Sequence, residues 1–274
     1  MKLSCTCLLL AILLFAGDFA SYGYQQESAT EEQAIVAIKR VGGRIAVDEN
    51  GSPLVLYLDG TRMTDADLKY SRGMTNVNEV VLSSTKVTDA GLENLKGMTK
   101  LGALLLGDTQ ITGAGLEHLS ALTSLQFLFL GNTQITDDGL VHLKDVTSLR
   151  RLMLTNTRTT DAGLVHLKGL TNLELLHLFR TQITDAGLEQ LKGLTNLQQL
   201  YLTNTKITDV GLEHLKELTN LTHLILDGTQ ITDSGLEHLK GLTKLEWLAV
   251  GNNQVTDEGV KKLQKALPHC KIQY

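Results

Sequence analysis

The hydrophobic pattern of this chain repeats every 24 residues from about Pro53 onward. A threonine marks each unit, and apolar residues stand three and five positions before it, as Leu130 and Leu128 stand before Thr133. Alternation of this kind predicts a short β-strand whose apolar side chains face inward. The markers are Thr61, Thr85, Thr109, Thr133, Thr157, Thr181, Thr205, Thr229 and Asn253, with no insertion between them.

A second element follows each marker and in most units reads Thr-Asp-x-Gly-Leu-x-x-Leu, as in the stretch that starts at Thr184. Thr184 is placed to cap a short helix, and the Asp185 carboxylate complements the positive end of the helix dipole. Leu188 and the leucine three residues later form a buried stripe. Gly187 lies inside the helix, which implies that the neighbouring unit packs too closely for a Cβ. Gly193 is expected to close the helix in a left-handed turn.

The residues before the first marker read as a cap. Residues 24–52 are expected to supply a capping helix and the first strand of a hairpin. The helix would run from Thr30 to Val41, and the strands Arg44 to Val47 and Leu54 to Leu58 would flank a turn. This module would cover the open face of the first unit.

Nine units fill residues 53–267, and each depends on its neighbours. Burial of about seven aliphatic side chains does not offset the entropy of ordering one unit, so stacking must supply the remainder. Residues 268–274 are expected to close the array as a strand without a helix, with Ile272 and Tyr274 in the two inward positions.

The pattern LxxLxLxxT followed by a helical return resembles the leucine-rich repeat family, with threonine where the family usually has asparagine. The segment ITDxGLxxL resembles repeats of F-box-associated receptors and, more closely, of exported bacterial proteins such as those of planctomycetes. The resemblance covers about Pro53 to Tyr274. It implies an α/β fold, a right-handed leucine-rich-repeat solenoid (horseshoe) with a parallel concave sheet and short convex helices. A ladder of threonine hydroxyls is expected to link adjacent turns, and Asn253 restores the family residue in the last full unit.

The outward-facing residues of the strands are free to evolve a function, since the inward ones hold the fold. They stand six, four and two positions before each marker and are expected to line the concave face. Eight Phe, Tyr and Trp residues follow Tyr24, and six of them lie at these positions. An aromatic surface with a polar rim is typical of an interaction site. The alternative is that aromatic residues simply suit an exposed sheet.

We therefore predict a partner-binding surface on the concave sheet. Its residues are Tyr57, Phe127, Phe129, Arg151, Met153, His177, Phe179, Tyr201, His223, Ile225 and Trp247. Arg151 could stack on a neighbouring aromatic ring. Together with Arg150 and Arg180 it adds positive charge, which favours an acidic partner, although an ion pair with Glu174 is an equal alternative.

The sequence predicts neither an enzyme nor a metal or cofactor site. The histidines at 118, 142, 166, 214 and 238 share one slot of the returning helix, and slots on the outer side of a horseshoe diverge, whereas zinc needs convergent ligands. We expect these side chains to form a solvated helix face. The chain has no G-x-S-x-G, no H-E-x-x-H and no phosphate-binding glycine loop.

The net charge of −5 and the absence of a basic run argue against nucleic acid or an anionic membrane as a partner. We expect a monomer that binds an unidentified protein partner. Cys270 is the only thiol beyond the first seven residues, so no internal disulfide is expected. Asn50 and Asn220 would be glycosylation acceptors only in a eukaryotic secretory pathway.

The N-terminal residues 1–23 have the layout of a signal peptide. Lys2 precedes an apolar run from Leu8 to Phe15, which is too short to span a bilayer, and small residues follow. Cleavage after Gly23 fits better than cleavage after Ala20, and an uncleaved anchor is the alternative. The mature chain is expected to be secreted, or to stay in the periplasm or cell envelope, without a membrane-inserted segment.

These features predict a noncatalytic, exported protein-recognition module that uses the concave sheet. One alternative is a structural element of the cell envelope that has no concave ligand. The other is a substrate receptor of the F-box type, and the secretory signal and the short stretch before the first unit argue against it.

Overall fold

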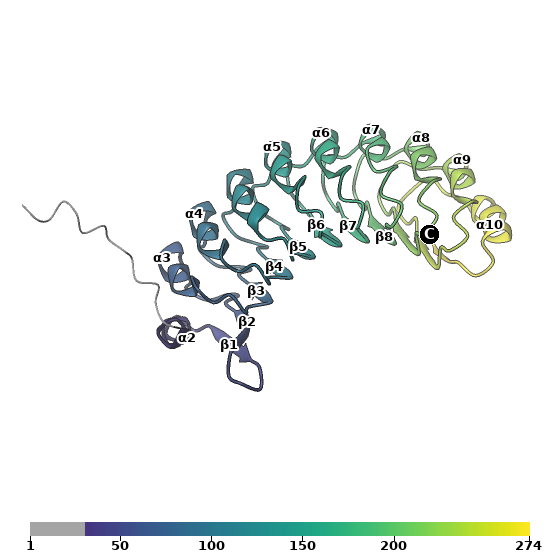
Figure 1. Cartoon of the computed structure of the whole chain (residues 1–274). Coiled ribbons are helices and arrows are strands. Elements are labelled where there is room, and N and C mark those ends of the chain that lie inside the picture. Colours follow the sequence, from purple (N-terminus) through teal and green to yellow (C-terminus); the bar gives the residue numbers. More distant parts are fainter. Residues whose placement is uncertain (1–30) are drawn as a thin grey trace, which may run out of the picture.

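The computed structural model describes residues 31–274, so the predicted signal peptide and the expected helix start at Thr30 lie outside the described residues. The described chain forms one curved array with a sheet on its inner side and helices on its outer side (Figure 1). Its sheet has 11 strands in sequence order, β1 to β11, and only the β1–β2 pair is antiparallel. The predicted leucine-rich-repeat solenoid is therefore confirmed.

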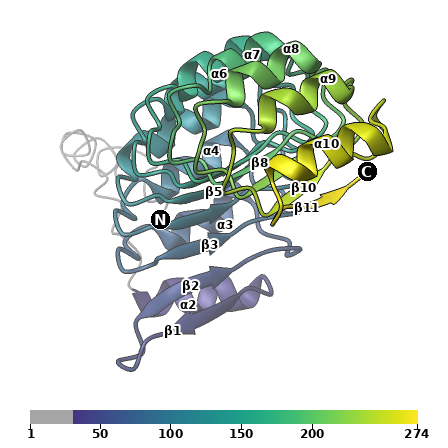
Figure 2. The same cartoon turned by 90° about the vertical axis from the view of Figure 1, so that its right-hand side faces the viewer.

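The N-terminal end consists of helix α2 (Glu31–Arg40) and the hairpin strands β1 (Arg44–Val47) and β2 (Pro53–Tyr57). Ile38 of α2 is buried, as the amphipathic pattern predicts. A Cβ at Gly43 would lie 2.7 Å from side-chain carbons of both Ile38 and Leu58. The helix therefore packs directly on the first unit, beside the hairpin at the end of the sheet (Figure 2).

The remaining strands are three residues long and pair in parallel without a register shift. They are β3 (Glu79–Val81), β4 (Ala103–Leu105), β5 (Phe127–Phe129), β6 (Arg151–Met153), β7 (Leu175–His177), β8 (Gln199–Tyr201), β9 (His223–Ile225), β10 (Trp247–Ala249) and β11 (Lys271–Gln273). The constant period keeps residues of the same slot side by side along the whole array.

The outer elements are short helices, most of which continue into a 3₁₀ turn. They are α3 (Asp65–Leu68), α4 (Asp89–Leu92), the 3₁₀ helix η3 (Gly113–Ala121), α5 (Asp137–Leu140), α6 (Asp161–Leu164), α7 (Asp185–Glu189), α8 (Asp209–Leu212), α9 (Asp233–Leu236) and α10 (Asp257–Ala266). The 3₁₀ turns after the α-helices are η1 (Lys69–Ser71), η2 (Glu93–Leu95), η4 (Val141–Leu143), η5 (Val165–Leu167), η6 (Glu213–Leu215) and η7 (Glu237–Leu239).

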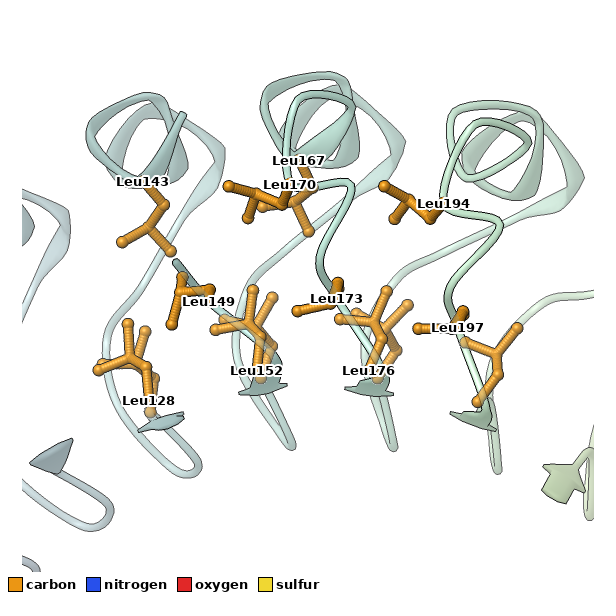
Figure 3. Close-up of a cluster of buried hydrophobic side chains, with 14 of the residues drawn as sticks. Leu128, Leu143, Leu149, Leu152, Leu167, Leu170, Leu173, Leu176, Leu194 and Leu197 are labelled. Carbon is orange, nitrogen blue, oxygen red and sulfur yellow. The ribbon is translucent and has the colours of Figure 1, made fainter. Parts of the chain in front are cut away.

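The core is a continuous row of aliphatic side chains between the sheet and the helices. Seven buried positions recur in each unit, for example Ile135, Leu140, Leu143, Val146, Leu149, Leu152 and Leu154. Figure 3 shows strand leucines such as Leu152 and Leu176 below helix leucines such as Leu143 and Leu167. Because these side chains interleave along the array, each unit buries the apolar face of the next.

A hydrogen-bonded carboxylate joins successive outer helices. Asp185 Oδ1 accepts from the backbone N–H of Thr208 at 2.8 Å, and its Oδ2 accepts from the Thr208 hydroxyl at 2.6 Å. The same bonds form in the pairs Asp65–Thr88, Asp89–Thr112, Asp137–Thr160, Asp161–Thr184, Asp185–Thr208, Asp209–Thr232 and Asp233–Thr256. Thr184 also caps its own helix, as predicted, by accepting from the Ala186 N–H. The aspartate thus binds the next unit through hydrogen bonds, in addition to its predicted interaction with the helix dipole.

The helix glycine is needed because this carboxylate occupies the space of a Cβ. A Cβ at Gly187 would lie 2.4 Å from Asp161 Oδ1, and one at Gly211 would lie 2.2 Å from Asp185 Oδ1. The predicted close approach is confirmed. One junction differs, because Gly113 takes the place of the aspartate and a Cβ at Gly139 would lie 2.3 Å from the Gly113 Cα.

Two expectations about the turns are wrong. Each marker threonine donates its hydroxyl to the carbonyl three residues earlier in its own unit, as Thr181 does to Leu178, so no ladder of threonines links adjacent units. Asn253 does link them, since its side chain reaches Thr229 and the Leu226 carbonyl. Gly193 is not left-handed.

The left-handed residue of each unit instead stands directly before the marker. The non-glycine residues with positive φ are Ser84, Asp108, Asn132, Asn156, Arg180, Asn204 and Asn252. Small polar residues tolerate this conformation best, whereas arginine does not share their local hydrogen bonding. Arg180 is therefore the one strained choice in this slot among the described residues.

The C-terminal strand closes the array with one correction. Ile272 of β11 packs against the core, but Tyr274 is 56% exposed and does not take an inward position. Its hydroxyl bonds to Asp257, which raises the pKa of Tyr274. Cys270 is buried, and burial raises the pKa of its thiol to about 11, so it is not a reactive thiol near neutral pH.

The aspartate–glycine junction predicts that replacement by alanine lowers the stability of the chain at a helix glycine that contacts the aspartate, but not at a glycine outside the junction. Gly211→Ala should destabilise the chain by about 1–3 kcal/mol, because the new methyl group displaces the Asp185 carboxylate from Thr208. Gly193→Ala is the matched control, since no atom lies within 4 Å of its Cβ position and its φ is not left-handed. Urea unfolding of both variants measures the difference, and equal stabilities would contradict this role of the junction.

Candidate functional site

The predicted surface residues lie on neighbouring strands of the concave face. Register pairs place Phe129 beside Met153, then His177, Tyr201 and Ile225, one residue per strand from β5 to β9. All five are half-buried, and none belongs to the core between sheet and helices. The sheet thus builds a continuous apolar and aromatic stripe along its inner side.

The flanking column holds the other predicted residues. Phe127 pairs with Arg151 on β5 and β6, and His223 pairs with Trp247 on β9 and β10. Leu175 and Gln199 separate these two pairs on β7 and β8. Tyr57 lies farther away on β2, and Val81 and Leu105 connect it to the stripe.

His177 is the centre of a ring cluster. Its imidazole stacks on the Tyr201 ring with centroids 4.5 Å apart, and it meets Phe179 edge-on at 6.4 Å. The Thr155 hydroxyl is 2.9 Å from its Nδ1. Burial lowers the pKa of His177, because the charged imidazolium loses hydration there. The cluster therefore presents an uncharged, stacked aromatic surface near neutral pH.

Phe129 is held by the backbone of its neighbours. A Cβ at Gly107 or at Gly131 would lie 2.4 Å from an edge carbon of the Phe129 ring, so the ring lies over both glycines. This ring contributes to packing of the sheet as well as to its surface. The observation supports, for this residue, the alternative that an aromatic side chain suits the exposed sheet.

Cations cover three other rings. Arg44 lies over Tyr57 at 5.2 Å, Arg180 over Phe179 at 4.9 Å and Lys271 over Trp247 at 4.5 Å. Such contacts stabilise exposed sites by about 0.5–1 kcal/mol each. The prediction that Arg151 stacks on a ring is wrong, because Arg180 occupies that role from the strained position after Phe179. The sequence signal was an arginine in a slot that otherwise holds Asn, Asp, Ser or Gly.

The alternative of an internal ion pair is confirmed for Arg150. Its Nε donates to Glu174 Oε1 at 2.9 Å, and its Nη2 bonds to the same oxygen. This bond raises the pKa of Arg150. Arg151, one residue further, points to the concave face and is exposed.

Two hollows adjoin Arg151. The larger, of about 490 Å³, is also lined by Phe127 and Gln126, and the smaller, of about 190 Å³, by Leu175 and Gln199. Both are open to solvent on the concave side. The glutamines were not predicted from the sequence, because their importance depends on which residues the register brings beside Arg151.

The outer face carries a separate hollow of about 650 Å³ at its C-terminal end, and Asp233, Glu237, Lys240, Lys262 and Lys265 are among the residues that line it. The histidines of the shared slot lie in the 3₁₀ segments η3 to η7 and are mostly half-buried, so a fully solvated face is not what forms there. Within residues 31–274, no group of His, Cys, Asp and Glu is arranged to hold a metal ion. The same part of the chain has no helix with the length and hydropathy to cross a bilayer.

Comparisons with known proteins agree with this architecture. A family model described as "Leucine Rich repeats (2 copies)" matches residues 171–217, and one described as "Leucine rich repeat" matches residues 195–255. No curated protein sequence matches the chain.

Two similar solved structures are internalins from Listeria monocytogenes strain 4b F2365. The structure of internalin C2 is 30% identical with a TM-score of 0.58, and the match covers 77% of this chain and 84% of that one. The structure of the internalin inlF is 23% identical with a TM-score of 0.58, and the match covers 80% of this chain and 72% of that one.

The lowered pKa of His177 predicts a dependence of stability on pH. As pH falls, the unfolded chain takes up the His177 proton before the folded chain does, so stability decreases from the ordinary histidine pKa down to the folded one. His177→Gln should make the stability curve flatter across this interval. Urea unfolding at a series of pH values compares the two proteins, with NMR titration of the imidazole as a direct check. Parallel curves for both proteins would show that burial of His177 has no such effect.

Proposed function

Because the chain belongs to the leucine-rich repeat family, we propose that it is a noncatalytic protein-recognition module that binds a partner on its concave sheet. Leucine-rich repeats typically serve as protein–protein interaction modules. The observation that carries the proposal is the row of rings and aliphatic side chains from Phe129 to Ile225, which stays outside the core on neighbouring strands.

The composition of the surface supports this function. Aromatic residues and arginine are the usual anchors of protein interfaces, and a rigid aromatic cluster loses little entropy when a partner docks. His177 and Tyr201 are already stacked, and Lys271 already covers Trp247. We propose that Tyr201 and Trp247 are the principal anchors, while Phe129 chiefly supports the sheet over Gly107.

Export completes the proposal. The layout of residues 1–23 favours a secretory signal, so the partner would lie outside the cytoplasm, in the periplasm, the cell envelope or the medium. A structural role in the envelope is the competing function. It would use lateral contacts, to which the exposed outer residues Val165 and Val210 would contribute.

A pair of matched variants distinguishes these functions. Tyr201→Ala/Trp247→Ala removes two concave rings, and we expect it to weaken partner capture at least about tenfold, as for truncation of interface anchors. Val165→Ser/Val210→Ser changes two exposed outer side chains and should capture partners as the native chain does.

The measurement is quantitative capture from the envelope and the medium of the source organism, with thermal unfolding of each variant as a check on folding. Loss of capture by Val165→Ser/Val210→Ser, with normal capture by Tyr201→Ala/Trp247→Ala, would contradict recognition on the concave sheet and support the structural role.

A further inference from the structure

The cationic side chains of the concave face differ in whether they have a partner within the chain. Most of them stack on a ring or form an ion pair, and these are Arg44, Arg150, Arg180 and Lys271. Arg151 is the exception. Within residues 31–274 its guanidinium forms no hydrogen bond, ion pair or ring contact, although its backbone is fixed in β6.

The carboxylate beside Arg151 is already occupied. Glu174 lines both hollows next to Arg151, but its Oε1 accepts from two nitrogens of Arg150. The Arg150–Glu174 pair is close to neutral as a unit. Glu79 also lines the larger hollow, but it lies three strands from Arg151 and forms no ion pair with it, so one positive charge beside Glu174 has no ion-pair partner. That charge belongs to Arg151.

The surroundings of Arg151 suit a particular ligand group. Phe127 pairs with it on one side and Leu175 on the other, and both offer apolar contact. Gln126 and Gln199 line the two hollows with amide groups that donate or accept hydrogen bonds. A ligand with a planar anionic group next to an apolar group would contact all of these side chains.

We propose that Arg151 binds a carboxylate of the protein partner, contributed by a side chain next to an apolar residue that packs against Phe127. The guanidinium fork matches a carboxylate with two parallel hydrogen bonds. A single free cation balances a monoanion, whereas a phosphate group carries about −1.5 to −2 and calls for more than one. This inference rests on the proposed recognition function and names the chemistry of the partner at that surface.

The test uses random linear peptides displayed on phage and selected on the protein. We expect the recovered peptides to be enriched in Asp or Glu beside an apolar residue. The tightest peptide is then synthesised with the acid and with the matching amide, and affinities are measured by calorimetry. Replacement of the acid by the amide, or Arg151→Gln, should weaken binding by about ten- to a hundredfold, and the two changes together should weaken it no further.

The neighbouring ion pair provides a sharp control. Arg150→Gln releases Glu174, which is then free to engage Arg151, so this variant should also lose affinity for the acidic peptide. Arg150→Gln/Glu174→Gln removes both charges of the pair and should restore it. Thermal unfolding verifies that the exposed Arg151→Gln variant is folded.

Several results would overturn the inference. In one such result, the selected peptides have no acidic residue, bind the Arg151→Gln variant normally and fail to bind the Tyr201→Ala/Trp247→Ala variant. This result would show that Arg151 binds no carboxylate of the partner, and it would leave the recognition function in place. Inhibition by inorganic phosphate at concentrations where acetate has no effect would assign Arg151 to a phosphate group. Peptides whose affinity is unchanged in both variants would contradict the inference and the recognition function. Failure to select any peptide would contradict both as well.

Discussion

Burial of each unit's leucines by the next unit is the interaction on which the structure depends. The side chains in the row from Leu128 to Leu176 are buried only in part by their own unit, since a short strand and a short helix enclose too little space, and the neighbouring units supply the remainder. The period therefore stays at 24 residues, because a single inserted residue would move the leucines of one unit out of line with those of the next. The Asp–Thr bond and the helix glycine are further consequences of the same close stacking.

A fixed period also decides where function can develop. Inward strand positions and helix leucines are committed to the core, and the aspartate and glycine slots are committed to the junctions. The concave columns remain, and their register makes any two successive units bring side chains into contact. His177 and Tyr201 become a stacked pair through this register alone, without adjacency in sequence.

The sequence predicts the fold well because its strongest signal, the spacing of apolar residues, is also the physical cause of the fold. The strands and the caps follow from the residue pattern of single units, and the glycine at 187 was the one signal of close packing between units that the sequence carried. Features that depend on relations between units were predicted poorly. Asp185 acts mainly on Thr208, the threonine ladder does not form, and Tyr274 is exposed. These outcomes were not predictable because hydrogen-bond partners across a junction depend on the distance between units.

On the concave face, the positions of the columns were predictable from the sequence. The sequence did not predict that Arg180 rather than Arg151 stacks on a ring, because this contact depends on the left-handed backbone at Arg180.

The junction between η3 and α5 bears on the shape of the concave face. There a Cβ at Gly139 would lie 2.3 Å from the Gly113 Cα, whereas a Cβ at Gly211 would lie 3.2 Å from the Asp185 Cα. The two outer elements are closer together, while the strands β4 and β5 beneath them keep the usual parallel pairing. A smaller separation outside with the same separation inside reduces the angle between these two units. We infer that the concave face is less curved at Phe127 and Phe129, where the proposed partner would meet less steric obstruction than on a uniform arc.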